Sequence, residues 1–324
     1  MKIAITGASG FIGLNLSRYL HQRGHKVIGL VRSADKVRLV RDLGVEFDVV
    51  DVTRRDSLNT VFREIEGVVH LAALFNDAEA SSEDFYQVNV DGTQNVLAAA
   101  MNCGVRRVVH CSTVGVAASG KPPYSEQTPC LPPDDKYETT KYEGEKVALD
   151  FHRECGFPVV VIRPAQVYGP GDTSKAKFYK MVHRGIMINP GKTMRHMVYI
   201  DDLCRAFELA MLNDQAVGEV FIIGDEKAIA LRELVDVVAH ELGVAPPKVW
   251  LPATPMKWLC ATTETVCPLL NVKPPLFRRS MDFFTRSLEF DVTKAQTCLG
   301  FRSQIDIPTG VAKTVAWYKV NGFL

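Results

Sequence analysis

The chain of 324 residues is predicted to adopt an α/β fold, a Rossmann-type doubly wound parallel sheet with a smaller, interleaved C-terminal lobe. Two observations lead to this class. Strand-like apolar runs alternate with amphipathic, helix-like runs through the first half of the chain, which is typical of βαβ units. Some runs, such as Val159–Ile162, are apolar throughout, as expected for strands that are covered on both faces.

The first element is a short strand that leads into a glycine-rich turn. Ile3–Ile5 are apolar, and Gly7, Gly10 and Gly13 then follow at three-residue spacing and open a helix-like segment. Glycine lets the backbone approach a pyrophosphate closely, and a helix N-terminus stabilises its charge. Because a second strand follows at Lys26–Val31, the turn indicates a dinucleotide site rather than a glycine-rich turn without a ligand.

The other elements of the first half follow in alternation. The predicted strands are Lys2–Thr6, Lys26–Val31, Glu46–Val50, Gly67–Leu71, Arg107–Cys111 and Pro158–Arg163. The predicted helices are Phe11–Arg23, Ser57–Glu64, Phe85–Asn102 and Tyr137–Glu154. We expect an NAD(P)-binding Rossmann domain over residues 1–165, to which the strand Val217–Ile223 returns, and a mainly substrate-binding lobe over residues 166–324.

In the second half, the regular alternation of strands and helices ends after the Pro- and Gly-rich stretch Arg163–Gly171. We expect a helix at Leu231–Leu242, a proline-broken connection at Val244–Pro255 and a helical tail at Thr309–Asn321. The segment 255–270, which carries Trp258, is interpreted as buried core. An apolar lid and a weakly membrane-adherent helix are the alternatives.

Composition narrows the class of protein. Hydrophobic residues make up 47% and charged residues 23%, which is ordinary for a soluble globular enzyme. The net charge of +1 argues against broad electrostatic binding to nucleic acid or anionic membranes, and no apolar run reaches the roughly 18 residues of a spanning helix. The eight cysteines form no CxxC pair, and no His, Cys or carboxylate set has metal-ligand spacing. We therefore expect a cytoplasmic protein with free thiols and no metal site.

Tyr137 and Lys141 are the main catalytic candidates. A spacing of four residues puts both on one helix face, and Asp134 or Asp135 is available to cap that helix. An isolated tyrosine has a pKa of about 10, and a neighbouring ammonium favours its phenolate. Such a tyrosine can exchange a proton with a substrate hydroxyl or carbonyl while hydride moves to or from a nicotinamide. The alternative is a packed tyrosine beside a solvated lysine.

The same spacing recurs at Tyr142 and Lys146. Five residues at about 100° each place this second pair roughly 140° around the helix, so both pairs cannot face one cleft. Tyr137 is preferred because it lies in the first turn, nearest the edge of the sheet where ligands bind. Tyr142 is interpreted as packing or dimer surface.

Ser112 and Thr113 follow the strand Arg107–Cys111 directly. Ligands of open α/β sheets gather outside the carboxyl ends of the strands, where a hydroxyl could bind the reacting oxygen. Thr113 is placed ahead of Ser112 for this role. The alternative for either residue is a hydroxyl that caps or turns the chain.

The adenosine half of the coenzyme is predicted from the second and third strands. Asp51 could accept a hydrogen bond from the adenine amino group, or it could be a turn aspartate. No acidic residue follows the second strand at the position that binds the ribose hydroxyls. Arg32, Lys36 and Arg38 lie there instead, which suits a 2′-phosphate and slightly favours NADP over NAD. A solvated basic loop is the alternative.

Taken together, these residues resemble the extended short-chain dehydrogenase/reductase family, also called the NAD-dependent epimerase/dehydratase family. The resemblance runs nearly end to end. It rests on TGASGFIG (residues 6–13), DVTRRDSL (51–58), VVHLAA (68–73), NVDGTQNVL (89–97), CST (111–113), YETTKYEGE (137–145), RPAQVYGPGD (163–172), VYIDDLCRAFELA (198–210) and FDVTKAQTCLGF (290–301).

The resemblance implies roles for the matching positions. Tyr137 would be the acid/base, Lys141 would hold the nicotinamide ribose, and Thr113 would orient the substrate. The coenzyme would be lined by Gly7, Ser9, Gly10, Phe11, Ile12, Gly13, Arg32, Lys36, Asp51, Val52, Leu71, Ala72, Ala73, Asn89, Pro164 and Val167. Members of the family often dimerise through the two helices predicted at residues 85–102 and 137–154, so a homodimer is expected.

Departures from the family pattern limit which of the family's reactions we expect. Val114 and Gly115 stand where dehydratases carry an acidic residue, which argues against dehydration, and Gln166 replaces an asparagine usual in nucleotide-sugar epimerases. Arg195 falls where an epimerase arginine would hold a sugar-nucleotide diphosphate, and a surface salt bridge is the alternative. The amino-acid sequences of residues 168–172 and 274–301 more closely resemble those of the 3β-hydroxysteroid dehydrogenase and dihydroflavonol-reductase-like branch of the family.

The leading hypothesis is an NAD(P)-dependent oxidoreductase that interconverts a secondary alcohol and a ketone on a small-molecule substrate. A nucleotide-sugar 4-epimerase is the first alternative. A non-catalytic nucleotide sensor is the second, and the presence of Tyr137 and Lys141 argues against it.

Overall fold

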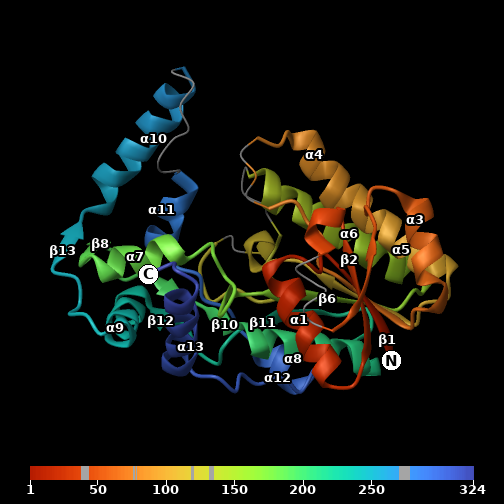
Figure 1. The fold of residues 1–324 in the computed structure, drawn as a ribbon. Coiled ribbons are helices and arrows are strands. Elements are labelled where there is room, and N and C mark those ends of the chain that lie inside the picture. The colour runs from red at the N-terminus through yellow and green to blue at the C-terminus, as the bar shows by residue number, and fades with distance from the viewer. Residues whose placement is uncertain (38–43, 76, 78, 118–119, 131–134, 270–277) are drawn as a thin grey trace.

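A seven-stranded parallel sheet forms the centre of the computed structural model, which describes residues 1–37, 44–75, 77, 79–117, 120–130, 135–269 and 278–324 (Figure 1). Its strand order is β11-β6-β5-β4-β1-β2-β3. The strands are β1 (Lys2–Thr6), β2 (Lys26–Val31), β3 (Glu46–Val49), β4 (Gly67–His70), β5 (Arg107–Cys111), β6 (Val159–Pro164) and β11 (Val220–Ile223). The chain reverses direction across the sheet between β1 and β4, and a ligand crevice is expected at this switch point.

Helices cover both faces of the sheet and enclose two apolar cores. One core holds α1 (Phe11–Gln22) and α8 (Ile200–Leu212), which pack on each other. The other holds α3 (Arg55–Val61), α5 (Gly92–Asn102) and α6 (Lys136–Cys155). This two-sided cover confirms the doubly wound class and explains why the central strands are apolar throughout.

Two predicted helices differ from the structure. The helix expected at residues 85–102 is built from α4 (Ser82–Tyr86), a π-helical turn (Gln87–Asp91) and α5. The one expected at residues 57–64 is α3 followed by a 3₁₀ turn (Phe62–Glu64). Apolar periodicity does not reveal a change of helix type, because each type keeps one side toward the core.

The C-terminal lobe carries three two-stranded sheets and several helices. Its sheets pair β7 (Gln166–Tyr168) with β10 (Met197–Tyr199), β9 (Met194–Arg195) with β12 (Ile229–Ala230), and β8 (Ile186–Ile188) with β13 (Val249–Leu251). Its helices are α7 (Ala176–His183), α9 (Leu231–Leu242), α10 (Ala253–Leu269), α11 (Arg278–Thr285), α12 (Thr293–Thr297) and α13 (Ile307–Val320). The predicted connection at residues 244–255 therefore contains a strand, β13.

The interpretation of Trp258 as core is wrong. Helix α10 projects from the lobe (Figure 1), and the Trp258 side chain is 72% exposed, while Leu259 beside it is 50% exposed. An apolar sequence shows that a helix can be covered, but it does not show that the rest of the chain reaches far enough to cover it.

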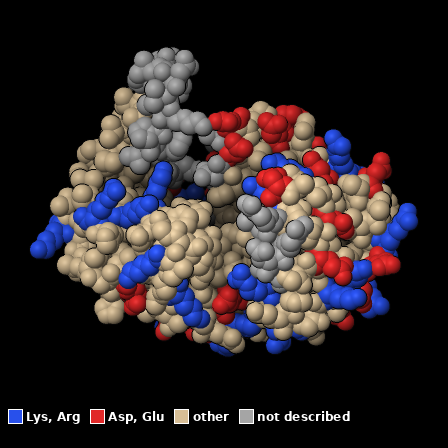
Figure 2. Space-filling view, in the orientation of Figure 1, with Lys and Arg blue, Asp and Glu red and all other residues tan. Residues whose placement is uncertain are grey.

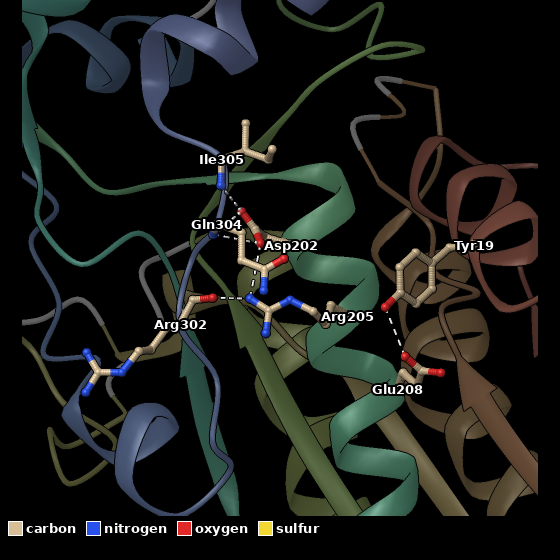
Figure 3. Close-up of polar contacts among 7 residues, drawn as sticks. All are labelled: Tyr19, Asp202, Arg205, Glu208, Arg302, Gln304 and Ile305. Carbon is tan, nitrogen blue, oxygen red and sulfur yellow. Dashed lines mark hydrogen bonds and ion pairs between the residues drawn. The ribbon is translucent and has the colours of Figure 1, made fainter. Parts of the chain in front are cut away.

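Helix α8 joins the first helix of the chain to its last segment through buried polar contacts (Figure 3). The carboxylate of Asp202 accepts hydrogen bonds from the backbone N–H groups of Gln304 and Ile305 at 3.0 Å. Two turns later, Glu208 accepts a hydrogen bond from the hydroxyl of Tyr19 in α1 at 2.9 Å. Helix α8 therefore links α1 to the segment that leads into α13.

Candidate active site

The glycine turn forms a tight cradle at the start of α1. Gly7 has a φ of +68°, and a Cβ there would lie 2.9 Å from the Cα of Ala72, so the turn rests directly on the exit of β4. A Cβ on Gly13 would lie 2.3 Å from the carbonyl oxygen of Gly7. Helix α1 has no side-chain cap and no acidic residue in its first turn. Its N–H groups thus suit a pyrophosphate, and the residues present fit a dinucleotide.

The loop that follows β7 approaches the same turn. The Asn15 side chain of α1 donates a hydrogen bond to the carbonyl oxygen of Pro170 at 3.3 Å. A Cβ on Gly171 would lie 3.4 Å from the ring of Phe11. The residues predicted for the pyrophosphate and those predicted for the nicotinamide side, Pro164 and Val167, therefore belong to neighbouring segments.

A buried chain of hydrogen bonds runs from the end of β1 into α5. Thr6 Oγ1 accepts from the N–H groups of Leu71 and Ala72, both at 3.1 Å, so its own proton goes to His70 Nδ1, 2.7 Å away. Burial lowers the pKa of His70 to about 3, which keeps the ring neutral. His70 Nε2–H then donates to Thr93 Oγ1 at 3.1 Å. This order fixes the tautomer of the ring.

Asn89 continues this network to α6. It lies in the π-helical turn and is fully buried. Its backbone oxygen accepts from the Thr93 hydroxyl at 2.7 Å, and its side-chain amide donates to Thr140 Oγ1 of α6 at 2.9 Å. The same side chain exchanges two hydrogen bonds with the backbone of Leu74. Asn89 thus holds the loop after β4, including Leu71, Ala72 and Ala73, against α6.

Tyr137 lies in the first turn of α6. Asp135 is the N-cap, and its carboxylate accepts hydrogen bonds from the N–H groups of Tyr137 and Glu138 at 3.0 and 3.1 Å. This is one of the two predicted caps; the other, Asp134, lies outside the described residues. The ring of Phe75, in the loop held by Asn89, contacts the Tyr137 ring edge-on with centroids 4.8 Å apart.

Lys141 is buried one turn further along, with 3% of its surface exposed. Burial lowers the pKa of its ammonium, while Cys111 and Glu145 act in the opposite direction. The neighbouring rings of His70 and His110 are also buried, and burial lowers the pKa of each. Both rings are therefore neutral.

The structure separates the two tyrosine–lysine pairs as the helix geometry predicts. Lys146 is exposed, lies 5.6 Å from the centre of the Tyr142 ring and forms an ion pair with Glu143 at 3.2 Å. Glu145, in contrast, faces inward and forms a buried ion pair with Arg163 of β6. Tyr142 and Lys146 therefore lie on the outer side of the helix.

Ser112 and Thr113 lie at the carboxyl end of β5. Ser112 is buried, and its hydroxyl has no hydrogen-bond partner within the described part of the chain. Thr113 Oγ1 accepts a hydrogen bond from the N–H of Gly115 at 3.3 Å, so it turns the chain and keeps its own proton to donate. A Cβ on Gly115 would lie 2.6 Å from Glu138 Oε1, which brings the end of β5 against the first turn of α6.

The predicted adenosine residues lie at the ends of β2 and β3. Asp51 Oδ1 accepts from the N–H and the hydroxyl of Thr53, both at 2.9 Å, which forms a turn. Val52 is buried against Gly92 of α5. Lys36 lies 3.8 Å from Asp35, and Arg38 falls outside the described residues.

Arg32 lines a cavity of about 300 Å³ between β2 and α4. Its other lining residues are Leu74, Asp77, Glu79, Ala80, Asp84, Gln87 and Val88. Three carboxylates thus share this space with one guanidinium. The sequence pattern gave no sign of them, because they lie some 45 residues further along the chain.

The substrate candidates of the second lobe are buried. Arg195 is 1% exposed and donates to the carbonyl oxygens of Phe283 and Asp282, with its guanidinium 4.8 Å from the centre of the Phe283 ring. The alternative of a surface salt bridge is therefore wrong for Arg195. The side-chain oxygen of Gln166 is buried without a hydrogen-bond partner among the residues described.

Sequence reasoning missed a buried carboxyl near these residues. Asp225 follows β11 and is 7% exposed, and neither of its carboxyl oxygens has a hydrogen-bond partner in the described ranges. Burial, with the charges of Asp202 and Asp306, raises its pKa to about 7. An acidic residue two positions after an apolar strand was the available signal. Among the described residues, no group of His, Cys, Asp and Glu is placed to hold a metal ion.

Comparison with known proteins decides the family. The model of the NAD dependent epimerase/dehydratase family matches residues 3–224. The chain belongs to this family. The match includes the glycine turn, the network around His70 and both residues of the Tyr137–Lys141 pair.

Proteins that are named for differing activities resemble the whole chain. A 4-hydroxy-2-methyl-3-oxo-4-farnesyl-3,4-dihydroquinoline-1-oxide ketoreductase from Stigmatella aurantiaca is 27% identical over 96% of this chain and 95% of its own. A UDP-glucose 4-epimerase from Vibrio cholerae is 28% identical, covering 97% and 94%. The solved structure of MoeE5 with UDP-glucuronic acid and NAD is 26% identical and covers 99% and 100%, with a TM-score of 0.77. The chain is thus an extended short-chain dehydrogenase/reductase enzyme.

Proposed function

We propose that this enzyme interconverts a secondary alcohol and a ketone with NAD(P) as the redox coenzyme. The single observation that supports this most is the buried Lys141 one helical turn after Tyr137, at the carboxyl edge of the sheet. A nicotinamide coenzyme bound along the glycine turn would supply or accept the hydride. Relatives that are named reductases and dehydrogenases support a net redox reaction.

In this proposal, residues of the chain transfer the proton, orient the substrate and bind the coenzyme. Tyr137 takes or gives the proton of the substrate oxygen, because the Lys141 ammonium favours its phenolate. Thr113 donates a hydrogen bond from its hydroxyl to the same oxygen and keeps its proton. The pyrophosphate lies against Gly7, Ser9, Gly10, Phe11, Ile12 and Gly13, while Asp51 and Val52 border the adenine.

The test replaces Tyr137 with Phe and follows NAD(P)H absorbance on a panel of secondary alcohols and ketones. Turnover should fall by at least about 1,000-fold, because the proton route is lost. Coenzyme affinity, measured by calorimetry, should change little. Tyr142→Phe, on the outer side of α6, is the matched control and should keep full turnover. Retained turnover in Tyr137→Phe would refute the assignment.

A nucleotide-sugar 4-epimerase is the second candidate, supported by the UDP-glucose 4-epimerase relative. Such an enzyme returns the hydride to the other face of the sugar and shows no net change in NAD(P)H. Incubation with UDP-glucose or UDP-glucuronic acid, followed by chromatography of the products, separates the two candidates. Nucleotide released on denaturing the purified protein would favour the epimerase.

For the coenzyme, we propose that Arg32 favours the 2′-phosphate of NADP and that Asp77, Glu79 and Asp84 limit this preference by repulsion. The family is NAD dependent, and the related MoeE5 structure holds NAD. Arg32→Ala should therefore weaken NADP binding by about tenfold and leave NAD binding nearly unchanged. Equal losses for both coenzymes in a calorimetric titration would count against this role.

We further propose a cytoplasmic homodimer whose residues 166–324 receive a small-molecule substrate. Helices α5 and α6 pack side by side on one face of the sheet and offer a paired surface to a second copy. Within the described residues, no helix is long and apolar enough to cross a bilayer. Sedimentation of Met101→Glu, at a side chain of α5 that is 39% exposed, tests the dimer.

A further inference from the structure

Four large apolar side chains are exposed on β8, β13 and the helix that follows β13. Val249 of β13 pairs directly with Ile186 of β8, and their side chains are 49% and 41% exposed. Trp258 and Leu259, on the helix that follows β13, are 72% and 50% exposed. We call Ile186, Val249, Trp258 and Leu259 the apolar tip. Exposed apolar groups clustered in this way commonly mark an interaction surface.

Two long stretches of sequence near the apolar tip contain Lys and Arg but no Asp or Glu. Residues 173–200 contain six Lys and Arg and no Asp or Glu, and residues 242–263 contain two Lys and no Asp or Glu. The exposed cations are Lys177, Lys180, Arg184, Lys192 and Lys248. None of these five forms an ion pair with another described residue, whereas Arg23 and Lys146 elsewhere do.

The net charge of the chain does not reveal that basic and acidic side chains gather in different places. Lys and Arg side chains spread over the end where Figure 1 places α7, β8 and β13, while acidic side chains gather over α4 (Figure 2). The net charge of +1 excludes a uniformly basic protein but not a basic end. The helices expected to pair in a dimer, α5 and α6, lie away from this end (Figure 1).

We propose that the apolar tip and its five cations dock the enzyme on an anionic lipid bilayer. Trp258 and Leu259 would enter the headgroup region, where an indole ring is favoured because it is both apolar and a hydrogen-bond donor. The cations would meet phosphate and carboxylate headgroups. Exposed apolar side chains beside five cations without an ion-pair partner among the described residues suit a wide, negatively charged plane. The proposal does not depend on which reaction the enzyme catalyses.

The test is flotation of the purified full-length protein with vesicles of phosphatidylcholine alone or with added phosphatidylserine. The protein should float with the vesicles that contain phosphatidylserine and stay below with those that do not. Raising the salt concentration tenfold should lower the bound fraction at least fivefold, because screening weakens the headgroup contacts. Binding to both vesicle types alike, or to neither, would overturn the proposal.

Matched variants assign the binding to this face. Trp258→Glu with Leu259→Glu should lower the bound fraction about tenfold, and Lys180→Glu with Arg184→Glu should do the same. Val49→Glu with Arg63→Glu, at exposed positions of the first domain, should bind as the parent does. Circular dichroism and calorimetric coenzyme binding check that each variant is folded. Unchanged flotation of both tip variants would overturn the proposal, as would a dimer that dissociates on Trp258→Glu substitution.

Discussion

Asn89 and Leu74 bind each other through two hydrogen bonds. The N–H of Leu74 donates to Asn89 Oδ1 at 2.7 Å, and Asn89 Nδ2 donates to the carbonyl oxygen of Leu74 at 3.2 Å. A side-chain amide thus pairs with a loop backbone as a neighbouring strand would. Because Asn89 also binds Thr140 of α6, the loop after β4 and α6 keep a fixed separation.

Replacing Asn89 with Asp tests this relationship. The carboxylate can still accept from Leu74 N–H, but it cannot donate to the oxygens of Leu74 and Thr140. We expect a loss of about 1–3 kcal/mol in the free energy of unfolding and roughly a tenfold loss in kcat/KM. Chemical denaturation and steady-state kinetics measure the two effects. Gln94→Glu, the same amide-to-carboxylate change at an exposed position of α5, should change neither; a similar loss there would contradict the assignment.

Substituting Gly13 with Ala tests the cradle. The added Cβ would lie 2.3 Å from the oxygen of Gly7 and 2.7 Å from the Cα of Ala8, and both are backbone atoms that cannot rotate away. The protein should lose about 2 kcal/mol of stability without coenzyme, together with most of its coenzyme affinity. Gly10→Ala, with a nearest contact of 3.3 Å, should lose clearly less stability. Thermal unfolding without coenzyme measures this order, and equal losses would show that the cradle is looser than described.

Glu145→Ala should unfold far more easily than Glu143→Ala, although both change one carboxylate on α6. Glu145 pairs with Arg163 in the interior, and removing it leaves a buried guanidinium without its partner. We expect a cost of about 3–5 kcal/mol. Glu143 pairs with the exposed Lys146, so its loss should cost less than about 1 kcal/mol. Urea denaturation compares the two, and similar midpoints would refute the difference.

Asp225 gives the stability of the protein a distinct pH dependence. The carboxyl has a pKa of about 7 when folded and about 4 when unfolded, so the folded state holds more protons between these values. Its contribution to stability therefore falls as the pH rises from about 4 to about 7 and stays low above. Asp225→Asn should gain about 1–3 kcal/mol at pH 8 and little at pH 4.5.

Urea denaturation at the two pH values measures the effect of Asp225. Asp48→Asn, at an exposed position of β3, is the control and should show no such difference. A gain for Asp225→Asn of the same size at both pH values would contradict the burial of an ionisable carboxyl.

Local signals predicted the parts of the site that one element creates. The strand, glycine turn and helix at residues 2–22 follow from backbone freedom and apolar spacing, and they appear as expected. The inward face of α6 follows from helix geometry, which separates Lys141 from Lys146. Family resemblance added Asn89, whose contacts span elements that are distant in sequence.

Features that depend on several distant segments were not predictable in this way. The order of hydrogen bonds from Thr6 to His70 and Thr93 needs three elements in register. The acidic side chains around Arg32 come from the segment after β4 and from α4, on the other side of the sheet's switch point. Trp258 was assigned to the core because apolarity does not report which surfaces the remaining chain can cover.

Strand β11 determines when the sheet can be completed during synthesis. It forms the outer edge next to β6, yet it is made of residues 220–223, more than 50 residues after β6 ends. Until the ribosome has released that segment, β6 presents an open row of backbone groups to other chains. A nascent or truncated chain that stops near residue 165 therefore exposes a surface for aggregation that the finished enzyme conceals.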